Sequence, residues 1–341
     1  MRNVKHFKVT ADDNGQRLDR WIKARVPELS YGLAQKLMRK GQIRVDSKRA
    51  KPDMRLEEGQ DIRIPMPDAK EIAAKKHQEH KRKLSPADID FIRSLVIYDD
   101  GDVIALNKPY DLAVQGGTKT RRHVDGLLPG LKNELGVVPR LVHRLDKDTS
   151  GVLLLARSAE AARRLGAMFK GREVKKIYWA LIAPVPEHHS GTIRAGILKG
   201  EGGRKEKMLV DDDKGKSAVT EYAILETAGK DAAFAAFWPR TGRTHQIRVH
   251  AQLIGCPIIG DRKYKKERPE QEFEHIPAEA DLDRLDMSRR LHLHARRVIL
   301  PHPLKKGRLD ISAPLPPELL KSWRVLGFET NSKTDPFGHM D

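Results

Sequence analysis

Two acidic residues, Asp146 and Asp148, lie in the stretch HRLDKDTSG at residues 143–151, directly before the apolar run VLLL. Arg144 and Lys147 flank them with positive charge. A carboxylate at the start of a buried strand can act as a nucleophile or as a base. We therefore take this stretch as the first candidate for a catalytic site.

A second stretch, TGRTHQIRVHAQLIGCPIIGD at residues 241–261, has the spacing of an amphipathic helix. Thr241 or Thr244 is expected to cap this helix, and Gly255 is expected to end it. The positions expected to pack inward are Ile247, Ala251 and Ile254.

Three polar residues of the same helix, His245, Arg248 and Gln252, share a different face. An arginine fixed on a helix can bind a buried carboxylate with two hydrogen bonds and keep it ionised. The alternative is a surface helix with scattered charge.

The overall charge indicates the class of partner. The chain has 341 residues and a formal net charge of +18. A surface with this excess of lysine and arginine favours a polyanion, and RNA is the leading choice. A basic protein without such a partner is the alternative. Binding to an anionic membrane would need a basic amphipathic helix or a lipid anchor, and the sequence has neither.

The sequence predicts a cytoplasmic protein. No apolar run approaches the roughly 20 residues that span a bilayer, and the N-terminus leads into no secretory signal. Cys256 is the single cysteine, which fits a reducing compartment, and its apolar neighbours predict a buried structural thiol. Nothing calls for an obligate dimer, so we expect a monomer.

Residues 7–66 are predicted to form a small N-terminal module. Two short amphipathic helices, at residues 16–26 and 30–41, precede two strands with alternating apolar positions. The pattern resembles the αL-type RNA-binding module named after a small-subunit ribosomal protein. A helical cap without RNA contact is the alternative. The cations expected to bind RNA are Arg39, Lys40, Arg44, Lys48, Arg49 and Lys51.

A polar, basic stretch at residues 67–88 is predicted to be a linker. Residues 89–330 then read as a strand-rich domain, in which helices are few and do not alternate regularly with strands. We therefore expect an α+β fold with a mixed, mostly antiparallel sheet. The charged segment at residues 198–217 receives no role.

Five stretches in this order, HRLDKDTSG, KKIYWAL, PRTGRTHQIRVH, IGCPIIGD and LHLHARRVILPHP, resemble the RluA-type pseudouridine synthases. With its basic N-terminal module, the chain is similar to the RluC and RluD branch, which modifies large-subunit ribosomal RNA. The resemblance implies that the protein isomerises specific uridines to pseudouridine. The reaction involves no redox change and no added group, so no cofactor is expected.

The resemblance also implies roles for individual residues. Asp146 matches the catalytic aspartate, as nucleophile or as base, and Arg144 matches the residue that enters the stack when the target base is flipped out. Tyr178 matches the pocket tyrosine. Arg248 matches the arginine that pairs with the catalytic aspartate, and Val249 beside it is expected to help line the pocket.

Two other functions stay open. The chain can be a ribosome assembly factor that only binds RNA, or an aspartate-dependent hydrolase of a nucleotide or glycoside, for which Asp148 is the sole obvious second carboxylate nearby. Zinc is not expected, because the histidines lack an HExxH or cysteine-pair spacing. We interpret them as structural or RNA-contacting residues: His143, His245, His250, His292 and His294.

Overall fold

The computed structural model describes residues 4–26, 28–29, 31–66, 84–117, 120, 122–171, 173–200, 207–264, 282, 284–332 and 334–340. The chain divides into two compact units, Met1–Lys83 and Leu84–Asp341, each of which is described by itself. The linker was predicted at residues 67–88, and its residues 67–83 lie outside the described residues. Its end, from Pro86, belongs to helix α4 (Pro86–Ser94), which is capped by the Ser85 side chain.

The first unit packs two helices, α1 (Leu18–Arg25) and α2 (Tyr31–Arg39), against an antiparallel sheet in the order β1-β4-β2-β3. Its core includes Trp21, Leu37 and Ile62. The turn between β2 and β3 uses left-handed backbone at Asp46 and Ser47, as a tight hairpin requires. The strands are β1 (Val4–Lys8), β2 (Arg44–Val45), β3 (Lys48–Arg49) and β4 (Asp61–Pro65).

The second unit is built on one eleven-stranded sheet. Its main path runs β11-β10-β12-β13-β9-β14-β8-β6-β5, while β15 pairs with β14 and β7 with β8. Among the described strands, β8 and β14 form the one parallel pair, so the predicted α+β class with a mixed, mostly antiparallel sheet is confirmed. The strands are β5 (Val96–Asp99), β6 (Val103–Lys108), β7 (Arg140–Leu141), β8 (Ser150–Ala156), β9 (Lys175–Ile182), β10 (Ser190–Lys199), β11 (Met208–Val210), β12 (Lys216–Ala228), β13 (Ala232–Pro239), β14 (Leu293–Pro301) and β15 (Arg308–Ser312).

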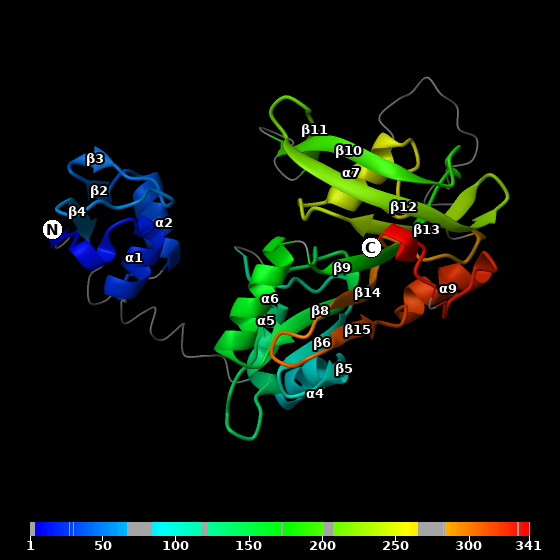
Figure 1. The fold of residues 1–341 in the computed structure, drawn as a ribbon, viewed down its shortest axis with the longest axis horizontal. Helices are drawn as coiled ribbons and strands as arrows, with labels where there is room; N and C mark the ends of the chain where they lie inside the picture. The colour runs from blue at the N-terminus through cyan, green and yellow to red at the C-terminus, as the bar shows by residue number, and fades with distance from the viewer. Residues whose placement is uncertain are drawn as a thin grey trace. The chain divides into compact units, whose positions relative to one another are not determined.

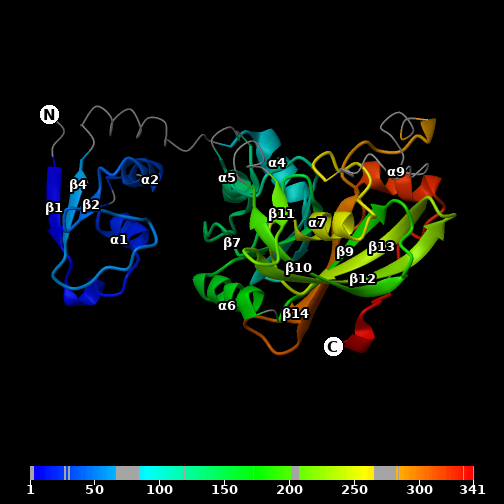
Figure 2. The same cartoon turned by 90° about the horizontal axis from the view of Figure 1, so that it is seen from above.

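Both faces of this sheet are covered by helices (Figures 1 and 2). Helix α7 packs its Ile247 and Ala251 against one face of β9 and β13, and α9 packs Trp323 against the other. This explains why β13 is buried at every position instead of alternating. Strand β8 is likewise buried at every position, between two other hydrophobic clusters. The remaining helices are α5 (Val124–Leu127), α6 (Ala159–Gly171), α7 (Gln246–Leu253) and α9 (Pro317–Val325).

The segment at 198–217 is described except for residues 201–206, and its two sides form the β10–β11 hairpin and a turn at Asp211. Cys256 is buried, as predicted. None of the helices in the described ranges has the length and hydrophobicity needed to cross a bilayer.

Candidate active site

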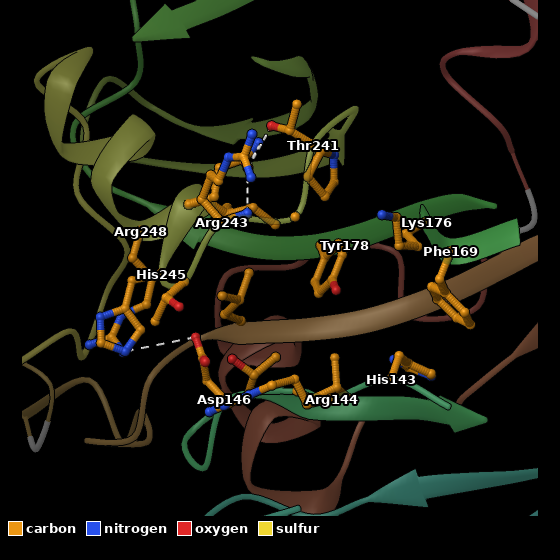
Figure 3. Close-up of a pocket in the computed structure, with 18 of the residues that line it drawn as sticks. His143, Arg144, Asp146, Phe169, Lys176, Tyr178, Thr241, Arg243, His245 and Arg248 are labelled. Atoms are coloured by element: carbon orange, nitrogen blue, oxygen red, sulfur yellow. Dashed lines mark hydrogen bonds and ion pairs between the residues drawn. The ribbon is translucent and has the colours of Figure 1, made fainter. Parts of the chain in front are cut away.

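A cavity of about 580 Å³ opens in the second unit, and its walls come from five separate segments of the chain. The loop before β8 contributes Asp146, strand β9 contributes Tyr178, and the segment leading into α7 contributes His245 and Arg248. Figure 3 shows these side chains extending into the same space. The structure therefore brings together Arg144, Asp146, Tyr178 and Arg248, which lie up to 104 positions apart in the sequence (248 − 144 = 104).

Hydrogen bonds to its backbone carbonyls hold the loop that carries Asp146. The amide of Thr149 donates to the carbonyl of Asp146 at 3.1 Å. The ammonium of Lys108, which is fully buried, donates to the carbonyls of Pro109, Leu112 and Lys147 at 2.8, 2.8 and 3.1 Å. Burial lowers the pKa of Lys108 to about 7, and the nearby acids Asp148 and Asp146 oppose that shift. Sequence reasoning missed Lys108, because only the fold places it under the loop.

The end of the loop must approach strand β14 closely. Gly151 has a φ of +109°, and a Cβ there would lie 2.2 Å from the carbonyl oxygen of Ala295. Ser150 beside it donates to Nδ1 of His294 at 2.9 Å. These two small residues therefore shape the turn from the loop into β8.

Tyr178 faces the cavity from β9, between Asp146 and the far end at Phe169 (Figure 3). Burial raises the pKa of its hydroxyl, and the negative charge of Asp146 raises it further. The hydroxyl is therefore protonated at neutral pH. A protonated phenol beside a carboxylate can donate a hydrogen bond to a substrate or return a proton to it.

Arg144 is exposed and lines the cavity. His143 next to it is a structural residue, as predicted. Its ring stacks on Phe169 with a centroid distance of 4.3 Å, and its Nε2 accepts the amide of Leu154 at 2.8 Å. Burial lowers the pKa of His143 to about 3, so this ring is neutral.

Helix α7 begins one residue later than it would with Thr244 as its N-cap. Its N-cap is His245, with left-handed backbone (φ 54°, ψ 19°) and no capping bond from its side chain. Neither Thr241 nor Thr244 is the cap, so that prediction is wrong. Thr241 instead donates to Oε1 of Gln246 at 2.7 Å and accepts the amide of Val219, which fastens the helix entrance to strand β12. The helix ends before Gly255, as predicted.

The predicted pairing of Arg248 with Asp146 is also wrong. Arg248 instead donates from Nε and Nη2 to the two carboxylate oxygens of Asp261, both at 2.7 Å, and both side chains are buried. Asp261 follows the turn at Gly260, whose lack of a Cβ lets the chain pass the carbonyl of Arg290. This turn brings a second carboxylate to the helix, and the spacing within residues 241–261 alone did not reveal it.

Val249 is not among the residues that line the cavity, so the expectation that it helps to line the pocket is wrong. It is buried in a small cluster with Ile197, Ala218 and Tyr264. Its side chain points about 100° around the helix axis from that of Arg248, which does line the cavity.

His245 is the side chain that approaches Asp146. Its Nε2 lies 3.8 Å from the Asp146 carboxylate (Figure 3). Its Nδ1 lies 2.7 Å from the hydroxyl of Tyr264. Burial lowers the pKa of His245 despite the opposing charge of Asp146. The sequence had placed His245 on one face with Arg248, but gave no reason to prefer the histidine as the neighbour of Asp146.

Other cations edge the same cavity. They come from α6, β9 and the segment before α7, and sequence reasoning did not single them out: Lys170, Lys176, Arg240 and Arg243. A polyanion entering the cavity would therefore meet positive charge on several sides.

In the first unit, all six cations predicted to bind RNA are exposed. They lie at the end of α2, on the β2–β3 hairpin and just after it. Arg44 makes only local contacts, to the carbonyls of Gly41 and Ser47, and Arg49 donates to the carbonyl of Arg39.

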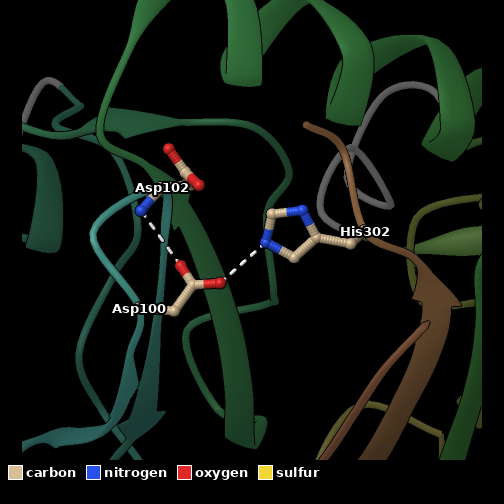
Figure 4. Close-up of side chains that lie close together, drawn as sticks. All are labelled: Asp100, Asp102 and His302. Carbon is tan, nitrogen blue, oxygen red and sulfur yellow. Dashed lines mark hydrogen bonds and ion pairs between the residues drawn. The ribbon is translucent and has the colours of Figure 1, made fainter. Parts of the chain in front are cut away.

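One cluster in the described residues has the composition of a metal site: Asp100, Asp102 and His302 (Figure 4). The polar side-chain atoms of this cluster already contact one another or neighbouring residues. His302 donates from Nε2 to Asp100 at 2.7 Å and accepts the amides of Leu304 and Lys305 at Nδ1. The Lys305 ammonium lies 2.8 Å from Asp102. The cluster therefore ties the β5–β6 turn to the β14–β15 turn.

Comparisons with known proteins agree with this geometry. A family model described as RNA pseudouridylate synthase matches residues 102–253, and an S4 domain model matches residues 16–62. A protein of Rickettsia bellii (strain RML369-C) named ribosomal large subunit pseudouridine synthase C is 34% identical over 88% of this chain and 94% of its own length. A protein of the same name from Salmonella typhi is 33% identical over 95% of this chain and 97% of its own.

Solved structures show the same fold. The structure described as human RNA pseudouridylate synthase domain containing 4 superposes with a TM-score of 0.59 at 28% identity, and covers 72% of this chain and 99% of its own. The structure described as human RNA pseudouridylate synthase domain containing 1 gives a TM-score of 0.50 at 27% identity, and covers 66% of this chain and 85% of its own.

Proposed function

This chain belongs to the RNA pseudouridylate synthase family and is an RNA pseudouridine synthase, and from that premise we propose that it modifies specific uridines of large-subunit ribosomal RNA with Asp146 as the reactive carboxylate. The observation that carries this proposal is a cavity lined by Asp146 and Tyr178 together with several cations. The name carried by its bacterial relatives supports the choice of RNA.

In the reaction, the bond from the uracil N1 to the ribose C1′ breaks, the uracil turns over, and a bond from its C5 to C1′ forms. The C5 proton is lost and N1 takes up a proton, so the product is an isomer of the substrate. Asp146 serves either as the nucleophile at the sugar or as the base toward a ribose proton. The residues of the cavity suffice for both routes, and no cofactor is needed for atoms or electrons to balance.

Arg144 and Tyr178 receive complementary roles. The target nucleotide has to leave the stack before it reaches Asp146, which costs about a few kcal/mol. Arg144, exposed at the rim, fills the vacated space. The ring of Tyr178 lies against the flipped uracil, and its protonated hydroxyl is available for proton transfer. Arg248 acts through the structure around Asp261 and does not contact the reacting carboxylate.

The first unit supplies general affinity for folded RNA through its exposed cations, and the protein acts in the cytoplasm as a monomer. A surface that contacts phosphates carries no sequence information by itself, so the choice of uridine falls to the second unit.

Pseudouridine mapping tests the function. Ribosomal RNA from cells with and without the gene is labelled with carbodiimide and read by primer extension. Loss of specific large-subunit stops in the deleted strain, restored by the wild-type gene, is the expected result. An unchanged map together with an assembly defect would favour the binding-only factor, and release of base or nucleotide by the purified protein would favour a hydrolase.

A further inference from the structure

The side chains behind Asp146 form a connected series. The amide of Met208 donates to the Tyr264 hydroxyl at 2.8 Å, and that hydroxyl lies 2.7 Å from Nδ1 of His245. The other ring nitrogen, Nε2, faces the Asp146 carboxylate at 3.8 Å. Tyr264 is fully enclosed, whereas the side chain of His245 keeps 12% of its surface exposed at the cavity wall.

These contacts select one tautomer of His245. The Tyr264 oxygen already accepts the Met208 amide, so its own hydrogen is available for Nδ1. When Nδ1 accepts that hydrogen, Nε2 carries the ring proton and points an N–H at the negative oxygen of Asp146. The opposite tautomer would turn a lone pair toward the carboxylate. Burial also lowers the pKa of His245, which keeps the ring neutral.

We propose that His245, held as its Nε2–H tautomer by Tyr264, positions the Asp146 carboxylate for attack or proton abstraction at the ribose. The proposal rests on the proposed catalytic role of Asp146. The 3.8 Å separation is longer than a hydrogen bond, as is common for catalytic contacts in a protein without substrate, and it shortens when substrate excludes water from the cavity.

The buried Arg248–Asp261 pair supports this series from the other end. Asp261 accepts the amides of Lys263 and Tyr264 at 2.8 and 3.1 Å, so the carboxylate that binds Arg248 also fixes the turn that carries Tyr264. The Arg248 guanidinium lies over the Tyr264 ring, 5.0 Å from its centroid. Besides its direct electrostatic attraction to Asp146, Arg248 thus affects Asp146 through Asp261, Tyr264 and His245.

The backbone of His245 is consistent with a positioning role. Left-handed backbone is uncommon for residues other than glycine, although histidine adopts it more readily than most, and it is retained where the surroundings favour it. Here it turns the imidazole toward Asp146 at the start of α7 instead of along the helix.

The direct test uses nitrogen NMR of protein with ¹⁵N-labelled histidine rings, in the absence of RNA. His245→Gln removes one signal and so identifies it among the 14 histidines. We expect that signal to show a neutral ring protonated at Nε2, to shift in Asp146→Asn, and to change toward the other tautomer in Tyr264→Phe. A ring protonated at Nδ1, a charged ring at pH 7.5, or a signal insensitive to both variants overturns the proposal.

The kinetic test follows single turnovers on a ribosomal RNA fragment in which the wild-type protein forms pseudouridine. Tyr264→Phe should slow the chemical step about tenfold, the effect of one lost hydrogen bond, with RNA affinity unchanged. Tyr222→Phe is the matched control, because its hydroxyl donates to the carbonyl of His188 outside the cavity. This control should keep the wild-type rate.

His245→Phe should slow the step roughly 100-fold, as the loss of an oriented donor does in other enzymes. His245→Gln should recover part of the rate, because its amide can still donate to Asp146. Equal rates for wild type, His245→Phe and Tyr264→Phe overturn the proposal. If Asp146→Asn keeps full turnover, the proposed function of Asp146 fails instead, while the NMR spectrum of the wild-type protein still reports on the geometry.

Discussion

The side chains around Asp146 divide by what they touch. Asp146, Tyr178 and Arg144 face the cavity and are available to RNA, whereas Arg248 and Asp261 satisfy each other in the interior. His245 lies between these two groups. A residue that lines the cavity should affect the rate on RNA, and a residue that is buried in a pair should affect folding as well.

Tyr178→Phe tests the first group. The substitution keeps the ring against the flipped uracil and removes only the hydroxyl, which is protonated because burial and Asp146 raise its pKa. We expect the single-turnover rate to fall by about 100-fold or more, the usual contribution of a proton donor, while RNA affinity stays near that of wild type. Rate measurements and filter binding on the same RNA check this. A variant with the wild-type rate would make Tyr178 a packing residue alone.

Arg248→Ala tests the second group. It leaves the carboxylate of Asp261 buried without its partner, and breaking such a pair costs about 3–5 kcal/mol. Arg248→Lys should recover little, because an ammonium cannot reproduce the two parallel bonds. Urea unfolding of both single variants and of Arg248→Ala/Asp261→Ala checks the pair. The double variant should lose clearly less than the two single losses added together, and strict additivity would contradict the pairing.

At the scale of elements, strand β14 and its flanking segment depend on neutral histidines. His292 donates from Nδ1 to the carbonyl of Ile259 and accepts the hydroxyl of Ser322 at Nε2. His294 donates from Nε2 to the carbonyl of Ala313 and accepts the hydroxyl of Ser150 at Nδ1. Protonation of either ring would break the bond from serine. Burial accordingly lowers the pKa of both rings to about 4.

Stability should therefore fall as the pH falls. A histidine with an unfolded pKa near 6.5 and a folded value near 4 contributes its full stability above pH 6.5 and loses it progressively toward pH 4, because only the unfolded chain takes up the proton there. For His292 the loss between pH 7.5 and pH 5 is about 2 kcal/mol. Urea unfolding should show that His292→Gln reduces the pH dependence by about this amount.

The exposed His339 supplies the control for this experiment. His339→Gln should leave the pH dependence of the free energy of unfolding unchanged. If His292→Gln behaves like His339→Gln, the ring of His292 does not titrate in the way that its contacts require.

Elements were predicted well where the pattern is local. The apolar spacing of residues 241–261 gave the inward positions of α7, and alternating or continuous apolar runs gave most of the strands around the cavity. The start of α7 was wrong, because Thr241 had a tertiary partner in Gln246 and strand β12 that outweighed local capping. Such competition is decided by contacts between segments far apart in the chain.

Part of the site was predicted because its residues belong to local sequence patterns. Asp146, Tyr178, Arg144 and Arg248 belong to short motifs, and their meeting in one cavity follows the family resemblance. Lys108, Tyr264 and Asp261 were missed because each acts through a backbone carbonyl, a ring nitrogen or a guanidinium from another segment. Two carboxylates were available to Arg248, and sequence spacing gave no way to choose Asp261 over Asp146.

At the scale of the whole molecule, the two units have separate cores and separate cationic surfaces. The first unit offers exposed cations, and the second offers a cavity with cations at its edge. We propose that the exposed cations of the first unit supply most of the affinity for RNA and that the cavity of the second unit performs the chemistry.

A charge-neutralising variant separates these contributions. Arg39→Gln, Lys40→Gln and Lys48→Gln together should reduce the slope of log affinity against log salt by roughly 2 to 3, if each contacts one phosphate. Lys5→Gln, Lys8→Gln and Lys23→Gln remove the same charge from exposed positions of the same unit and serve as the control. Binding to structured RNA across a salt series checks this. Equal slopes for the two triple variants would show that the predicted surface does not bind RNA.

The central claim is that Asp146 performs the isomerisation, and turnover by Asp146→Asn tests it most directly. Purified wild-type protein and the variant are incubated with large-subunit ribosomal RNA that lacks pseudouridine, and the product is mapped by carbodiimide labelling and primer extension. The account predicts pseudouridine at specific positions with the wild-type protein, none with the variant, and similar RNA affinity for both, because asparagine keeps the shape of the side chain and removes only the reactive charge. Full turnover by Asp146→Asn would contradict the account.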